Sequence, residues 1–135
     1  TKVGTKFSEL CDFASGIYKN KFKITKWVTV SSDPNYILNL GHTVPGSFEK
    51  NLVFGNSFEE IKETIRTKRV HIIDKENFMI PETCAFTLES RIEHISDPGM
   101  PSAYFHLIIC FNEGQKITMD NFRGIFNIVD MDYTL

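Results

Sequence analysis

Residues 83–115 read TCAFTLESRIEHISDPGMPSAYFHLIICFNEGQ, and this stretch decides the fold. Its first part, Thr83 to Ile95, alternates apolar and polar side chains, which is typical of a strand with one buried face. A loop rich in Pro and Gly follows at 97–101, and Ala103 to Asn112 is the next predicted strand. The residues Asn112-Glu113-Gly114 then form a turn. The stretch therefore predicts two long strands that lie next to each other and pair antiparallel.

The second of these strands has no properly polar face. Ala103, Phe105, Leu107, Ile109 and Phe111 share one side, and the other side carries Tyr104, His106, Ile108 and Cys110. A strand that is apolar on both faces is covered on both faces or lies in an interface. The residues Tyr104, His106, Ile108 and Cys110 are therefore candidate interface residues.

Two amphipathic helices are expected before the long strands. The first covers residues 5–19, with one apolar face and Thr5 as its cap. The second starts at Asn56, with Glu59 completing a capping box. Its buried face is expected to consist of Phe58, Ile61 and Ile65. The charges between them indicate a solvated face with i,i+3 ion pairs.

Further strands are expected at 22–31, 36–40, 70–73 and 78–80, and a final strand runs through Phe122, Gly124, Phe126 and Ile128 towards Tyr133. There is no internal repeat and no linker, so residues 1–135 are expected to form a single domain. The order of elements predicts an α+β fold. We expect a curved antiparallel sheet, with the last strands in a meander and helices packed on one face.

Composition narrows the classes of function. The net charge of −2 argues against a nucleic-acid-binding domain, which needs a concentrated basic surface. No apolar run approaches the roughly 20 residues of a membrane-spanning helix, so a soluble domain without a membrane span is expected. The twelve Phe residues indicate a wide core, an internal pocket or a hydrophobic interface.

No catalytic, metal or cofactor motif is present. The three cysteines lie far apart and form no C-x-x-C pair, so neither a zinc site nor a redox motif is indicated. There is no P-loop, no G-x-G-x-x-G and no G-x-S-x-G. We therefore expect no catalytic residue, no metal and no cofactor. The compartment stays open, with a lean towards an intracellular, reducing one.

The layout of residues 54–133 resembles the NTF2-like fold. The stretches that carry the resemblance are FGNSFEEIKETI, TCAFTLESRIEH, AYFHLIICFNEGQ and NFRGIFNIV. The resemblance implies a cone-shaped fold with a cavity between sheet and helices, and members often dimerise through the open face of the sheet. Some members are isomerases or dehydratases that use a His or Asp in the cavity. Members usually begin with two consecutive helices, whereas here a strand-like segment containing Trp27 follows the first helix, so a PAS-like or other α+β sheet also fits.

Two hypotheses of function follow from these patterns. The first is a non-catalytic interaction or assembly module, whose partner is a second copy of the chain or another protein. The second is a small-molecule site, with or without isomerase or dehydratase activity, in a cavity lined by Phe86, Phe105, Phe111 and Phe126. Four histidines are available for acid–base chemistry: His42, His71, His94 and His106. His106 is expected to be structural or part of an interface, and His42 to have no more than a loop role.

Overall fold

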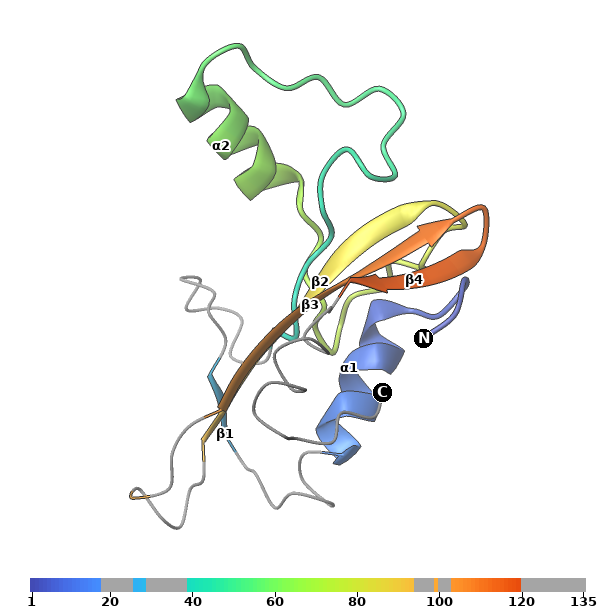
Figure 1. Cartoon of the computed structure of the whole chain (residues 1–135), viewed down its shortest axis with the longest axis vertical. Coiled ribbons are helices and arrows are strands. Elements are labelled where there is room, and N and C mark those ends of the chain that lie inside the picture. Colours follow the sequence, from blue (N-terminus) through green and yellow to red (C-terminus); the bar gives the residue numbers. More distant parts are fainter. Residues whose placement is uncertain (18–25, 29–38, 94–98, 100–102, 120–135) are drawn as a thin grey trace, which may run out of the picture.

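A computed structural model describes residues 1–17, 26–28, 39–93, 99 and 103–119, and it has an α+β architecture. Figure 1 shows helix α1 beside the sheet and helix α2 standing away from it. The elements follow in the order α1 (Phe7–Gly16), β1 (Lys26–Val28), α2 (Phe58–Lys68), β2 (Cys84–Glu93), β3 (Ala103–Asn112) and β4 (Gln115–Met119).

The four strands form one antiparallel sheet in the order β1-β2-β3-β4. The long strands β2 and β3 pair from Cys84↔Phe111 to Ile92↔Ala103. The turn to β4 places Glu113 at φ 51° and Gly114 at φ 80°, and two consecutive positive φ angles are the geometry of a tight hairpin turn. The predicted antiparallel pairing of the two long strands and the predicted turn are therefore confirmed.

Segment 39–44 extends the sheet along the part of the β2 edge that β1 leaves unpaired, although it is not a regular strand. On one side it bonds to β2, with Thr87 N donating to His42 O (2.8 Å) and Glu89 N to Leu40 O (2.8 Å). On its other side Ile72 N donates to Gly41 O (2.8 Å), and an isolated bridge joins His42 to His71. Residues 70–72, segment 39–44, β2, β3 and β4 thus lie side by side.

Gly41 allows segment 39–44 to approach β2 this closely. Its φ is 156°, and a Cβ placed there would lie 2.0 Å from Thr87 O and 2.8 Å from Thr87 C. Backbone atoms of a paired strand cannot move out of the way without breaking the pairing. Only glycine fits, because it has no Cβ and tolerates this backbone conformation.

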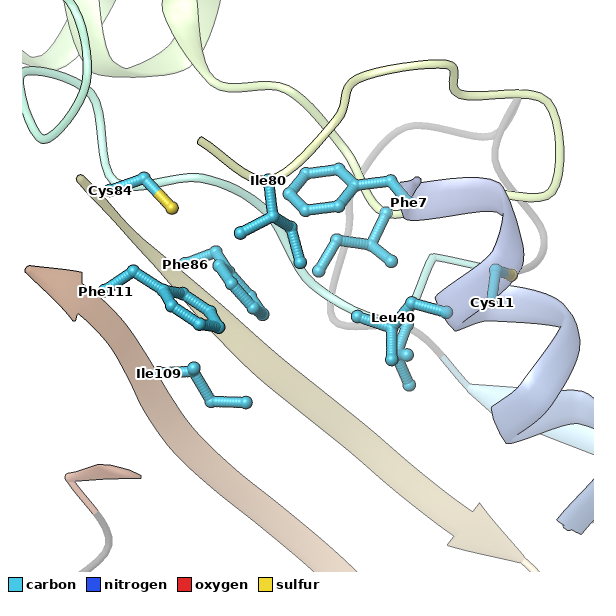
Figure 2. Packing of buried hydrophobic residues seen from close by; sticks show 10 residues of the cluster. Phe7, Cys11, Leu40, Ile80, Cys84, Phe86, Ile109 and Phe111 are labelled. Carbon is cyan, nitrogen blue, oxygen red and sulfur yellow. The ribbon is translucent and has the colours of Figure 1, made fainter. Parts of the chain in front are cut away.

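The core lies between the sheet and α1. Phe7 on α1 is fully buried, and its ring centroid lies 5.5 Å from Phe86 on β2 and 4.9 Å from Phe78. Leu40, Ile80 and the β3 side chains Ile109 and Phe111 complete the cluster that Figure 2 shows. The apolar face predicted for the first helix is confirmed by the burial of Phe7, Leu10 and Cys11.

The start of α1 differs from the prediction. Lys6, not Thr5, is the N-cap residue, and Glu9 Oε2 accepts a hydrogen bond from Lys6 N (3.2 Å). The Thr5 hydroxyl instead accepts from Lys2 N (3.3 Å), because Thr5 belongs to the turn before the helix. The cap is therefore shifted by one residue from the one expected.

Helix α2 forms where it was expected, but the prediction of its buried face was wrong. It has no buried residue: Phe58 is 75% exposed, Ile65 is 39% exposed and Ile61 is half-buried. Its apolar stripe has only these three side chains, and no described helix or strand lies against it. The helix is instead held by local interactions, including the predicted i,i+3 pairs Glu59–Lys62 and Glu63–Arg66.

Several shorter elements also differ from those expected. Residues 70–73 and 78–80 are not strands; each forms only one isolated bridge, at His71 and at Met79. Residues 39–40 of the expected 36–40 strand are irregular. Strand β4 had not been predicted. The expected strand through Phe122 and Phe126 lies outside the described residues.

Candidate functional site

The sheet has an outer face, turned away from α1 and the core. The strand register places its side chains, because residues paired across antiparallel strands point to the same side. Cys110 pairs with Ala85 on β2 and with Ile117 on β4, and Ile108 pairs with Thr87 and Met119. The described members of the outer face are Ala85, Thr87, Glu89, His106, Ile108, Cys110, Ile117 and Met119.

One end of the outer face is apolar and open to solvent. We call Ile108, Cys110, Ile117 and Met119 the apolar patch. Ile117 is 54% exposed and Met119 is 59% exposed, while Ile108 and Cys110 are half-buried. The Cys110 thiol lies 3.8 Å from Met119 Sδ. Exposed apolar side chains that touch one another across two strands are typical of a surface that another molecule covers.

The other end of the outer face carries a carboxylate between two imidazoles. Glu89 Oε1 lies 3.6 Å from His42 Nε2 and 3.6 Å from His106 Nε2. Three adjacent segments supply these groups: segment 39–44, β2 and β3. The side chains of His42 and Glu89 are about one-fifth exposed, and that of His106 is 45% exposed. Protonated imidazoles at these distances form ion pairs with the carboxylate.

Beside this group, Asn39 and His71 form a second polar contact. Asn39 Nδ2 lies 2.7 Å from His71 Nδ1, and Asn39 Oδ1 accepts from Gly41 N at 3.0 Å. Asn39 is only 6% exposed, so its amide depends on these protein partners. The rings of His42 and His71 meet edge to face, with their centroids 6.1 Å apart. The polar end therefore holds three histidines and one carboxylate.

Among the described residues, no group of three His, Cys, Asp or Glu side chains is arranged to hold a metal ion. No helix in the described part of the chain is long and apolar enough to cross a membrane.

On the core side of the same strands, burial raises the pKa of the Cys84 thiol to about 11, and the nearby Cys110 adds to this rise. Cys84 is 2% exposed, and its thiol points to the Pro81 carbonyl oxygen at 3.9 Å. A thiol of this kind remains protonated at neutral pH and is a poor nucleophile. It is therefore a packing residue.

The predicted interface residues all belong to β3. His106, Ile108 and Cys110 lie on the outer face; His106 is exposed, and Ile108 and Cys110 are half-buried. Tyr104 pairs with Arg91 through its backbone, and its side chain lies outside the described part of the structure.

The two predicted pocket residues whose side chains the structure describes, Phe86 and Phe111, lie in the packed core. Phe86 is fully buried and Phe111 is 3% exposed, and their rings stack with centroids 6.4 Å apart (Figure 2). Phe105 belongs to β3, but its side chain is outside the described part, as is the whole of Phe126. A hollow of about 380 Å³ lies elsewhere, beside Leu10 and Phe13 of α1.

Sequence reasoning missed two parts of this surface. His42 was given only a loop role, yet it faces both Glu89 and His71. The exposed Ile117 and Met119 of β4 were not recognised as strand residues. Their alternation in the run QKITM, with one intervening Thr, was the only available signal.

Comparisons with models of known protein families, with characterised proteins and with solved structures found no match.

Proposed function

We propose that this chain is a non-catalytic interaction module that self-associates through the outer face of its sheet. The observation that carries the proposal is the apolar patch, in which Ile117 and Met119 are more than half exposed beside Ile108 and Cys110. Covering these side chains removes apolar surface from water, which is the main favourable contribution to association.

The polar end supports an interface of limited extent. Glu89, His42 and His106 lie beside the apolar patch and provide a hydrated, charged border. An apolar centre with a polar rim is the usual anatomy of protein interfaces. The NTF2-like resemblance, which we retain as a proposal together with the curvature of the sheet, points the same way, because members often pair through this face.

The small-molecule alternative has less support. Phe86 and Phe111 are closed into the core by contacts with each other and, for Phe86, with Phe7. Rings packed at this density leave little space for a ligand between them.

Single substitutions on β4 test the proposal. Ile117→Asp and Met119→Asp each place a charge in the apolar patch, and we expect either change to weaken self-association at least about tenfold. Val53→Asp is the matched control, since Val53 is also an exposed apolar residue (83%) but lies before α2. The dissociation constant of each variant is measured by sedimentation equilibrium.

The two sets of variants separate the possible results. Weaker association of both β4 variants together with an unchanged Val53→Asp variant supports the outer face. The proposal is contradicted if all three variants have the same dissociation constant, or if only Val53→Asp associates more weakly than the wild type.

A further inference from the structure

Segment 39–44 is held by two sets of backbone hydrogen bonds, one on each side. The first seam joins it to residues 70–72 and consists of Leu40 N→Ile72 O (2.9 Å), Ile72 N→Gly41 O (2.8 Å) and Thr43 N→Val70 O (2.9 Å). The second seam joins it to β2 and consists of Val44 N→Ala85 O, Thr87 N→His42 O and Glu89 N→Leu40 O, each 2.8 Å. The side chain of His71 lies at the first seam, and that of His42 lies at the second.

At the first seam, the hydrogen bonds require His71 to be neutral. Gly41 N can only donate, so the Asn39 atom that it contacts is the carbonyl oxygen Oδ1. The Asn39 amide nitrogen therefore points to His71 Nδ1, 2.7 Å away, and it must donate. His71 Nδ1 is consequently the acceptor and carries no proton, and the neutral ring has its proton on Nε2.

At the second seam, the contacts of His42 provide partners for a charged ring. His42 Nδ1 lies 2.9 Å from Thr43 O, and a carbonyl oxygen can only accept, so Nδ1 carries a proton. In a neutral ring the other nitrogen, Nε2, would then be bare and would face the Glu89 carboxylate at 3.6 Å. A second proton on Nε2 converts this contact into an ion pair.

We propose that segment 39–44 is a pH-sensitive latch, in which protonation of His71 opens the first seam while protonation of His42 secures the second. His71 is faced by His42 from segment 39–44, and His42 is faced by Glu89 on β2. Through that carboxylate His42 also interacts with His106 on β3. The nearest charged residues along the chain of His71 are Arg69 and Asp74.

Acidification acts on the first seam through Asn39. A proton on His71 Nδ1 removes the acceptor of the Asn39 amide, which is too deeply buried to find water instead. The amide cannot rotate to compensate, because Oδ1 is needed by Gly41 N. The segment therefore loses the Asn39–His71 contact, although Val70 N still donates to Thr43 Oγ1 (2.9 Å), and it remains bonded to β2.

Amide hydrogen exchange followed by NMR tests the latch, because each seam has its own backbone N–H groups. Protection factors, which correct for the intrinsic effect of pH, are compared at about pH 7.5 and about pH 5, the range in which histidines change charge. The amides of Leu40, Thr43 and Ile72 report on the first seam, and those of Val44, Thr87 and Glu89 on the second. The variants are His71→Asn, whose side-chain oxygen can accept in place of Nδ1 without titrating, and Glu89→Gln.

The latch predicts about a tenfold loss of protection at the first seam of the wild-type chain at the lower pH, with the second seam unchanged. His71→Asn abolishes this loss, and Glu89→Gln adds a loss at the second seam, because the charged His42 ring then faces no carboxylate. Equal responses of both seams in the wild-type chain would overturn the proposal even if a variant failed to fold. A proton found on His71 Nδ1 at neutral pH, from the nitrogen chemical shifts of the ring, would overturn it as well.

Discussion

Gly41 is the residue at which the backbone geometry leaves no choice of side chain. Its φ is 156°, and any Cβ at this position would lie only 2.0 Å from Thr87 O, so an L-residue would be both strained and in collision with β2. The pairing of segment 39–44 with β2, and the position of His42, both depend on this glycine.

We expect Gly41→Ala to destabilise the chain by about 3 kcal/mol, the sum expected of backbone strain and displacement of a paired strand. Gly16→Ala is the control, because Gly16 ends α1 with open space around it, and alanine there is expected to be neutral or slightly stabilising. Urea unfolding of both variants measures the difference. A Gly41→Ala variant as stable as the wild type would contradict the close approach.

The two cysteines next to each other on β2 and β3 should differ in reactivity. Cys84 is buried with its pKa raised to about 11, whereas Cys110 is half-buried on the outer face. We expect iodoacetamide at about pH 8 to label Cys110 and to leave Cys84 unmodified until the chain unfolds. Peptide mass spectrometry identifies the labelled cysteine. Rapid labelling of Cys84 in the folded chain would contradict its burial.

The same pKa predicts a loss of stability in alkali. The folded chain keeps the Cys84 proton up to about pH 11, whereas an unfolded chain releases it near the ordinary value of 9.0. The contribution of the Cys84 proton to the free energy of unfolding is therefore fully present below pH 9 and is lost as the pH rises towards 11. Cys84→Ala should remove this part of the pH dependence of unfolding, and an unchanged alkaline profile would argue against it.

At the scale of elements, α2 shows how a helix forms without burying a face. Ser57 Oγ accepts from Glu60 N (3.2 Å), and Glu60 Oε2 accepts from Ser57 N (3.0 Å). The backbone N–H of Ser57, then its hydroxyl, and then the backbone N–H of Asn56 hold the pKa of Glu60 below its ordinary value. A capping box predicted at Asn56 and Glu59 is thus present one residue later.

Capping substitutions distinguish these two positions. We expect Ser57→Ala to lower the local stability of α2 by about 1 kcal/mol, because it removes the side-chain acceptor at the cap. Asn56→Ala leaves that acceptor in place and should have little effect. The exchange rate of the Ile61 amide, which donates to Ser57 O, measures the local stability. Faster exchange in Asn56→Ala than in Ser57→Ala would show that Asn56, as predicted from the sequence, is the N-cap residue.

The elements that could be predicted from the sequence are those specified by local pattern. Strand β2 follows from its alternation, β3 follows from an apolar run of strand length bounded by turn residues, and the turn follows from Asn112-Glu113-Gly114, whose glycine tolerates positive φ. Segment 39–44 could not be predicted, because its partners at 70–72 and on β2 lie far away along the chain. The same holds for the contacts of His42, since no spacing in the sequence connects it with Glu89 or His106.

At the scale of the whole molecule, the sheet separates a packed side from an exposed one. The core side is closed by Phe7 of α1 against Phe86, while the outer face keeps apolar side chains in solvent. The apolar faces of β2 and β3 predicted the first property. The second depends on β4, whose Ile117 and Met119 enlarge the surface that Ile108 and Cys110 begin.

The measurement that tests self-association most directly is the molar mass of the wild-type chain by light scattering across a concentration series. The proposed interface predicts a mass that rises with concentration towards twice the 15.5 kDa of one chain. A mass that stays at 15.5 kDa up to the highest concentration would contradict it.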